Sequence, residues 1–230
     1  MRVWHFTSES VSEGHPDKVC DYISDSILDA YLERDPLSRV ACEALCKGDT
    51  VVLAGEITSE AEVDHEAVVR RAVADIGYTD ASEPFNAEGL RLLQFISKQA
   101  AEIAQGVDPR KNVSGEQGAG DQGIMFGYAT DETPELMPLP IMLAHRLART
   151  LAQDRHEGRC AWLRPDAKTQ VTVLYEAGEP KEVTDVVVST QHASGTSQDE
   201  IRQYVIESLA PRALDRWFHP RIRFSVNPTG

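Results

Sequence analysis

The sequence predicts an α+β fold of two similar domains, each with a mixed or antiparallel sheet and helices packed on one face of it. Two kinds of pattern support this class. Several segments have an apolar side chain at every third or fourth residue, as amphipathic helices do. Other segments have strand-like patterns and follow one another in pairs joined by a short turn, as β-hairpins do. Helix and hairpin patterns occur on both sides of a glycine-rich stretch, so we expect an N-terminal domain over 1–102 and a second domain over 118–230.

The first domain is predicted to contain two helices and three strands. An apolar residue at every fourth position predicts a helix over 18–34, and Pro16 suits its start because the first helical N–H needs no partner. Valine, cysteine and leucine are frequent in 39–46 and 50–58, which predicts a β-hairpin. The remaining elements are a helix over 63–76, ended by Gly77, and a strand over 90–97.

The second domain combines the same kinds of element. Leu143, Leu147 and Leu151 lie four residues apart and predict a helix over about 140–153. Ser197 and Glu200 form a capping-box pattern that starts another helix, which extends to about residue 209. The expected strands begin at 124, form a second hairpin over 169–175 and 182–190, and close the chain over 221–226.

The composition limits the classes of function. The chain has 230 residues and a formal charge of −14, which argues against nonspecific nucleic-acid binding because that depends on a basic surface. No apolar run approaches the roughly 18 residues of a membrane span, and the N-terminus has no signal-peptide core. We therefore expect a cytoplasmic protein without membrane contact. An anionic substrate would have to bind with a metal ion or at a local group of cations.

The residues from Gly118 to Gly123 fit the G-x-G-x-x-G pattern of dinucleotide-binding enzymes, but their surroundings do not. That pattern requires a buried strand before the first glycine and a helix after the last. The preceding residues are polar and include Pro109, and the following residues are strand-like. A glycine-rich turn stays open as the alternative, with Asp121 as a carboxylate where the backbone can approach a ligand closely. A nicotinamide-dependent oxidoreductase would rest on these glycines alone.

Two clusters of side chains could carry chemistry. His15, Asp17 and Lys18 combine a proton donor, a metal-ligating carboxylate and a cation at a helix N-terminus, where phosphate binds favourably. The alternative is a capped helix start. Asp166 and Lys168 are two residues apart at the start of a strand and therefore point to the same side. The alternative for this pair is an exposed ion pair.

Glu43 and Glu56 each interrupt an apolar strand. A carboxylate in such a strand needs either solvent on its side of the sheet or a cationic partner. If each glutamate simply faces water, it is an ordinary surface residue.

Five blocks of sequence, in order along nearly the whole chain, resemble the S-adenosylmethionine synthetase (methionine adenosyltransferase) family. The blocks are Phe6–Lys18, Val40–Glu43, Leu53–Thr58, Gly118–Thr133 and Trp162–Lys168. The resemblance implies that the sulfur of methionine attacks C5′ of ATP and expels the whole triphosphate, which is then hydrolysed to pyrophosphate and phosphate. An acidic protein must offset the charge of that leaving group with Mg²⁺ and a few placed cations.

The resemblance assigns roles by position. His15 is expected to contact the triphosphate near the cleaved bond, and Asp17 to ligate Mg²⁺. Asp166 and Lys168 correspond to the ATP site, with Lys168 reaching phosphate, so His15 and Lys168 are the expected catalytic residues. Glu43 corresponds to the ligand of K⁺.

Further positions complete the expected site. Glu56 and Gln99 correspond to the methionine contacts, and Asp121 falls where the family holds the adenosine and methionine region of the substrates. Residues 103–117 correspond to a mobile active-site loop, and their glycine and lack of apolar periodicity suit a lid. Residues 118–230 correspond to the central domain. The family also implies a homodimer or homotetramer with active sites between two subunits.

Two departures from the family keep a second function open. The family continues with a phosphate-binding segment and a third α+β domain, which we expect to be absent here. Ala100-Ala101-Glu102 stands where the family usually has Ser-Pro-Asp, at the hinge of the loop. The chain is therefore expected either to synthesise S-adenosylmethionine from ATP and methionine or to be a catalytically incomplete fragment that binds nucleotide or pairs with another chain.

Overall fold

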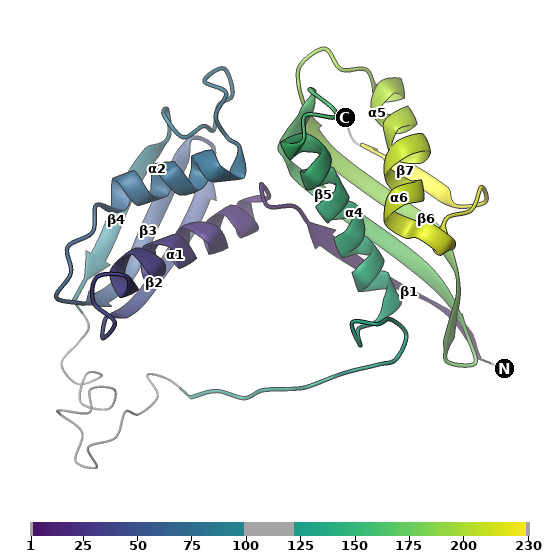
Figure 1. Ribbon diagram of the computed structural model, residues 1–230, viewed down its shortest axis with the longest axis horizontal. Coiled ribbons are helices and arrows are strands. Elements are labelled where there is room, and N and C mark those ends of the chain that lie inside the picture. Colours follow the sequence, from purple (N-terminus) through teal and green to yellow (C-terminus); the bar gives the residue numbers. More distant parts are fainter. Residues whose placement is uncertain (1, 99–121, 229–230) are drawn as a thin grey trace. The chain divides into compact units, whose positions relative to one another are not determined.

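The computed structural model describes residues 2–98 and 122–228, which divide into two compact units. Of the described residues, one unit contains 2–18 and 128–228, and the other contains 19–98 and 122–127. Each unit is a sheet covered by helices on one face (Figure 1), so the predicted α+β class with two sheets is confirmed. Gln99, Asp121 and the loop 103–117 lie outside the described residues.

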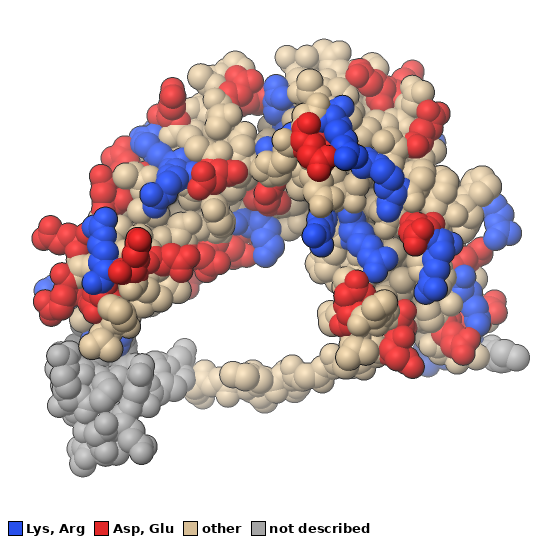
Figure 2. Space-filling model, in the orientation of Figure 1, with Lys and Arg blue, Asp and Glu red and all other residues tan. Residues whose placement is uncertain are grey.

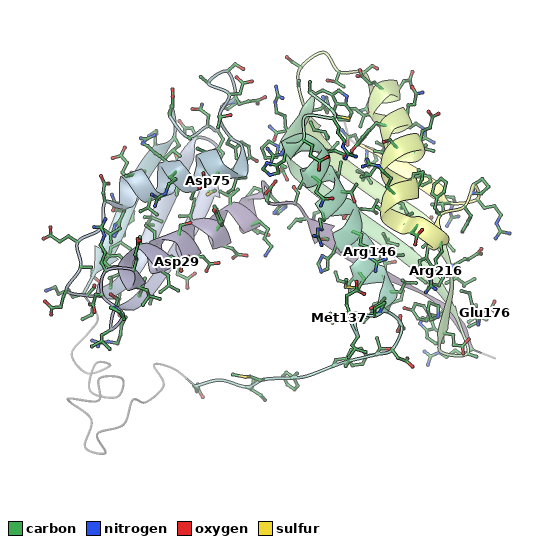
Figure 3. The ribbon with its side chains drawn as sticks, in the orientation of Figure 1. Asp29, Asp75, Met137, Arg146, Glu176 and Arg216 are labelled. Carbon is green, nitrogen blue, oxygen red and sulfur yellow. The ribbon has the colours of Figure 1, made fainter. Side chains whose placement is uncertain are left out.

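A four-stranded sheet forms the unit of residues 2–18 and 128–228. The strand order is β1-β5-β6-β7, with bounds Val3–Val11, Leu163–Glu176, Glu179–His192 and Arg223–Val226. Strand β5 is antiparallel to β1 and β6, and β7 is parallel to β6. The predicted second hairpin and closing strand are therefore confirmed. Glu176, labelled in Figure 3, marks the hairpin end of β5.

Strand β1 is an element that the sequence patterns do not predict. Its burial does not alternate regularly, and its partner is remote: the hydroxyls of Thr7 and Thr172 lie 2.9 Å apart although 165 residues separate them. Such pairing depends on tertiary contacts, which no local pattern records. As a result residues 2–18 belong to the same compact unit as residues 128–228. The division expected from the sequence grouped them with residues 19–102.

Three α-helices cover one face of this sheet: α4 (Leu139–His156), α5 (Gln198–Tyr204) and α6 (Ala210–Leu214). Leu143, Leu147 and Leu151 of α4 are buried, as their spacing predicts. Ser197 caps α5 by accepting a hydrogen bond from the N–H of Glu200, which confirms the predicted start. A π-helical segment, Val205–Leu209, joins α5 to α6, and it ends just before Pro211, whose ring cannot continue regular α-helical bonding.

The strand predicted from Ile124 is wrong. Residues 122–130 form neither strand nor helix, and Ile124, Met125 and Phe126 are 80–95% exposed. Apolar and aromatic residues favour a strand only where a neighbouring strand can pair with them. The next helix after Gly123 begins at Leu139, so the helix required by the dinucleotide-binding pattern does not follow these glycines.

The other unit contains a three-stranded sheet in the order β2-β3-β4, with bounds Arg39–Lys47, Thr50–Thr58 and Arg91–Ser97. Strands β2 and β3 are antiparallel, and β4 is parallel to β3. Helix α1 (Pro16–Leu32) starts two residues before its prediction, and α2 (His65–Ile76) is capped by Asp64 at its start and Gly77 at its end. The helices bury Val19, Ile23, Ile27, Val69 and Val73 with Val51 and Leu53 of β3.

No described helix of this unit covers the opposite face of the β2-β3-β4 sheet, which is called the open face below. Leu45, Val52 and Leu93 are paired across the three strands, and Phe95 lies in the next row. Leu45, Leu93 and Phe95 are 58%, 41% and 67% exposed. Figure 2 shows the helix-covered face of this unit, where charged side chains of both signs occur.

Candidate active site

A pocket of about 380 Å³ lies at the end of the four-stranded sheet away from its β5–β6 hairpin. Its volume is within the range of small-molecule sites, about 300–1,000 Å³. Its lining comes from the loop before α1, the start of β5, the end of β6 and the turn after β7. The lining residues are His15, Asp166, Ala167, Lys168, Ser189, Thr190, Gln191 and Asn227.

The strand alternation of β5 directs Asp166 and Lys168 into this pocket. Ala167 and Thr169 are buried toward the helices, so Asp166 and Lys168, which alternate with them along the strand, project to the opposite face of the sheet. The sequence predicts that Asp166 and Lys168 point to the same side of the strand, and both side chains line the pocket. Lys168 is not isolated, because its Nζ lies 3.5 Å from Oε1 of Glu9 on β1.

The loop between β1 and α1 is held against the start of β5. The N–H of Ser12 donates to the carbonyl of Ala167 at 2.8 Å. Its hydroxyl donates to the carbonyl of Pro165 at 2.6 Å and accepts from the N–H of Ala167 at 2.7 Å. The N–H of Gly14 donates to the same Pro165 carbonyl, and a Cβ at Gly14 would overlap Pro165. Glycine is therefore required for the close approach that brings His15 to the pocket.

The imidazole of His15 has a defined orientation. Its Nδ1 accepts a hydrogen bond from the N–H of Asp17 at 3.2 Å, so the neutral ring carries its proton on Nε2. The His15 side chain is 21% exposed. Asp17 is 88% exposed and lies in the first turn of α1, with Oδ2 3.7 Å from Nδ1 of His15. The ring therefore presents an N–H donor, and the carboxylate is open to a ligand.

Burial raises the pKa of Asp166, while electrostatic interactions with His15 and Lys168 oppose the rise. The carboxylate thus sits where water solvates it poorly and where cations partly replace that solvation. A perturbed carboxyl group beside an imidazole and an ammonium group in a pocket is typical of a functional site.

Sequence reasoning missed the lining from β6 and the turn after β7. Asn227 fixes this part: its Oδ1 accepts from the N–H of Thr190 at 2.9 Å, and its Nδ2 donates to the Thr190 carbonyl at 3.0 Å. Its own N–H donates to the carbonyl of Val188 at 2.9 Å. These bonds hold Ser189 and Gln191 at the pocket edge. No local pattern in the sequence marks them, because the contact joins segments 37 residues apart.

Glu43 and Glu56 belong to the other compact unit, on the open face of its sheet. Glu43 is exposed and opposite Ala54, whereas Glu56 is half-buried and opposite Ala41. Neither carboxylate forms an ion pair with a described residue. Gly55, between them in the sheet, has φ +143°, and a Cβ there would overlap the Ala41 carbonyl, so this position also requires glycine. The structure therefore shows these glutamates on a solvent-facing surface.

Two features are absent from residues 2–98 and 122–228. No group of three His, Cys, Asp or Glu side chains there is arranged to hold a metal ion. None of the helices in this part of the chain is long and apolar enough to span a membrane.

Comparison with known proteins agrees with the resemblance seen in the sequence. Residues 3–101 match the N-terminal domain of S-adenosylmethionine synthetase, and residues 116–230 match its central domain. An S-adenosylmethionine synthase of Sorangium cellulosum (strain So ce56) is 54% identical over 234 aligned residues, which cover 100% of this chain and 55% of the relative. The chain thus spans about half the length of that relative. On the evidence of both domain matches, the chain belongs to the S-adenosylmethionine synthetase family.

Proposed function

We propose that this chain binds ATP and methionine as part of an S-adenosylmethionine synthetase. In the proposed reaction the methionine sulfur forms a bond to C5′ of ATP, the bond from C5′ to the triphosphate oxygen breaks, and the triphosphate is then hydrolysed to pyrophosphate and phosphate. One observation carries the proposal most strongly. His15 comes from one end of the chain and Asp166 and Lys168 from about 150 residues later, yet all three line one pocket of suitable size.

The chemistry of these side chains suits a triphosphate leaving group. The Nε2–H of His15 can donate to the oxygen that gains negative charge as the bond breaks. The ammonium group of Lys168 can bind phosphate, and the positive end of the α1 helix dipole lies beside His15. Asp166 accepts hydrogen bonds from a hydroxyl or amino group of the substrate. We therefore assign His15 and Lys168 catalytic roles and Asp166 a binding role.

The carboxylates that we assign as ligands of Mg²⁺ and K⁺ are exposed. Mg²⁺ is usually held by one or two carboxylates together with substrate phosphates, and Asp17 offers one exposed carboxylate beside the pocket. Mg²⁺ bound there would supply positive charge against the triphosphate. Glu43 offers an exposed carboxylate for K⁺.

Methionine and the partner subunit complete the proposal. We assign Glu56, Gln99 and Asp121 to contacts with methionine and adenosine, and residues 103–117 to a loop that covers the site. The chain is proposed to form a homodimer or homotetramer with sites between subunits. The open apolar face with Leu45 and Phe95 supports this assembly, because contiguous exposed apolar surface is typical of an interface.

A second function has its own support. The chain covers only 55% of the relative that it matches, so the cations and metal ligands of this pocket could fall short of those that the full reaction requires. In that case the chain would bind nucleotide, or pair with another chain, without catalysis.

An assay of the purified chain separates the two functions. The chain is incubated with ATP, methionine, Mg²⁺ and K⁺, and S-adenosylmethionine and pyrophosphate are quantified, while calorimetry measures ATP binding. Formation of both products, lost in Lys168→Met, supports synthesis. ATP binding without product supports the incomplete fragment, and a folded chain that neither binds ATP nor forms product contradicts both synthesis and nucleotide binding and leaves pairing with another chain.

Asp17→Asn tests the proposed magnesium ligand. Because the Asp17 side chain is 88% exposed, we expect the free energy of unfolding to change by no more than about 0.5 kcal/mol. The melting temperature should therefore stay close to that of the wild-type chain. ATP affinity measured with Mg²⁺ should fall, and the difference between ATP affinity with and without Mg²⁺ should shrink. A large loss of melting temperature would show instead that Asp17 acts in capping α1.

A further inference from the structure

The loop that carries His15 makes a second contact, with helix α4. Oε1 of Glu13 accepts a hydrogen bond from Nη2 of Arg155 at 2.5 Å and lies 2.8 Å from Nε2 of His156. The Arg155 side chain is only 12% exposed, and that of Glu13 is 36% exposed. A charge-assisted bond that is largely shielded from water is stronger than an exposed ion pair.

The partners of Glu13 belong to a firmly held element. Arg155 and His156 are in the last turn of α4, whose leucines are buried against the sheet. The hydroxyl of Thr169 on β5 also donates to the carbonyl of Ala144 on α4 at 2.8 Å. The end of α4 therefore has a fixed place relative to β5, and a side chain bonded to it cannot drift.

We propose that Glu13 and Arg155 are positioning residues that hold His15 in its place at the pocket. Ser12 and Gly14 bind the loop to β5, and Glu13, between them in sequence, binds it to α4. With attachments on two sides, the backbone just before His15 cannot move toward either element. Glu13 does not line the pocket, so it acts through His15 and not on the substrate.

The consequence for function follows from geometry. A displacement of about 1 Å at a reacting group can reduce a rate by as much as about 100-fold. The orientation of His15 depends on one hydrogen bond, from the N–H of Asp17 to Nδ1. A loop released on the α4 side would let the imidazole sample other orientations in which that bond is lost. This inference rests on the proposed role of His15 at the triphosphate.

The test compares Glu13→Gln, Arg155→Met and the double variant with the wild-type chain. Three quantities are measured: the melting temperature, the Kd for ATP with Mg²⁺, and the imidazole ¹⁵N signals of His15 without ligand, which report its tautomer and mobility. We expect Glu13→Gln to raise the Kd about tenfold and to reduce the Nε2–H tautomer of His15. The double variant should be no worse than the worse single variant, because both remove one contact. Glu13→Asp, which keeps the negative charge, should have a Kd for ATP between those of the wild-type chain and Glu13→Gln.

Glu135→Gln is the matched control. Oε1 of Glu135 accepts a hydrogen bond from Arg146 at 3.1 Å, so it also ties a loop to α4, but away from His15 (Figure 3 labels Arg146). We expect this variant to leave the ATP affinity and the His15 signals unchanged. Its melting temperature shows how much a pair of this kind contributes to folding alone.

The outcomes distinguish the inference from the proposed function. If Glu13→Gln lowers only the melting temperature and leaves both the His15 signals and the ATP affinity as in wild type, Glu13 is structural and the inference is overturned. If the wild-type chain does not bind ATP, the proposed function fails, and the His15 signals alone decide: altered signals support positioning, and unaltered signals overturn it.

Discussion

At the scale of single residues, the pocket depends on groups that have no catalytic chemistry of their own. Gly14 permits the approach of the loop to Pro165, and Asn227 holds the segment around Thr190. Asp166, in contrast, is proposed to bind substrate, and its carboxylate is held where water solvates its charge poorly. Substitution of Gly14 is therefore expected to reduce stability and ATP binding together, whereas substitution of Asp166 is expected to reduce ATP binding alone.

Gly14→Ala is predicted to destabilise the unit and weaken ATP binding together. The added methyl group would overlap Pro165, so the loop has to move, and overpacking of this kind costs about 1–3 kcal/mol. Thermal unfolding and calorimetry measure the two effects. Gly127→Ala is the control for stability, because its Cβ would meet nothing within 4 Å, and its melting temperature should match that of wild type. Equal melting temperatures for the two variants would contradict the close approach at Gly14.

Asp166→Asn is predicted to weaken ATP binding without loss of stability at neutral pH. Burial raises the pKa of Asp166, so ionising it costs the folded state more than the unfolded state. This cost is absent below the ordinary pKa of 3.8, grows as the pH rises through the raised pKa, and is complete above it. The substitution removes the cost, so the melting temperature at pH 7 should stay equal or rise.

Asp185→Asn gives the opposite case for comparison. The hydrogen bond from Arg223 lowers the pKa of Asp185, so its contribution is present above 3.8 and is lost as the pH falls through the lowered value. The variant should melt lower than wild type at pH 7. If Asp166→Asn also melts lower, Asp166 is stabilising in its ionised form and the argument from burial is wrong.

At the scale of elements, a buried carboxylate joins the helices of the larger unit. Asp154 on α4 is 1% exposed and accepts hydrogen bonds from both Nη atoms of Arg212 and from the hydroxyl of Tyr204 at 2.5 Å. Burial alone would raise the pKa of Asp154, but the hydrogen bonds from Arg212 and Tyr204 outweigh it and lower the pKa. The charge of Asp154 thus stabilises the packing of α4 with α5 and α6.

Asp154→Asn is predicted to lower the free energy of unfolding at pH 7 by about 2–3 kcal/mol, since it breaks a largely buried ion pair. Tyr204→Phe, which removes one neutral donor, should cost about 1 kcal/mol. The contribution of Asp154 is fully present above its ordinary pKa of 3.8 and is lost as the pH falls through the lowered value. Urea denaturation at pH 7 and pH 3 tests this, and a variant deficit that persists unchanged at pH 3 would contradict the assignment.

At the scale of the whole molecule, the open face of the β2-β3-β4 sheet needs an explanation. The rows Leu45–Val52–Leu93 and Glu43–Ala54–Phe95 run across it, so apolar side chains surround the glutamate assigned to K⁺. A second copy of the chain would remove these apolar groups from water and would cover that glutamate as well.

Phe95→Asp is predicted to prevent association of the chain. The wild-type chain should sediment as a dimer or tetramer at micromolar concentration, and a charge at Phe95, which is 67% exposed on the edge strand β4 of this face, should make it monomeric. Leu37→Asp serves as the control, because Leu37 is 80% exposed in the turn before β2, outside this face. A wild-type chain that stays monomeric at all concentrations tested would contradict the proposed oligomer.

The sequence predicted the elements whose patterns are local. Helices α1, α2, α4 and α5, both hairpins and the strands β4 and β7 follow from spacing, capping and turn residues that lie within each segment, whereas α6 lies beyond the predicted end of the helix that Ser197 starts. It also predicted His15, Asp166 and Lys168 as candidates, because their residue types stand at a helix start and on one side of a strand. Their roles, like those of Asp17, Glu43 and Glu56, stay proposals.

By itself, then, the sequence determined the α+β class and the family, since both depend on residues in order along the chain. Only the tertiary structure decided that β1 joins the sheet of β5, that residues 122–130 are not a strand, and that Asn227 and the end of β6 complete the pocket. It also decided that Glu13 meets Arg155, 142 residues away. The physical reason is common to these cases: pairing and packing between distant segments depend on which surfaces meet after folding, and a local pattern contains no information about its partner.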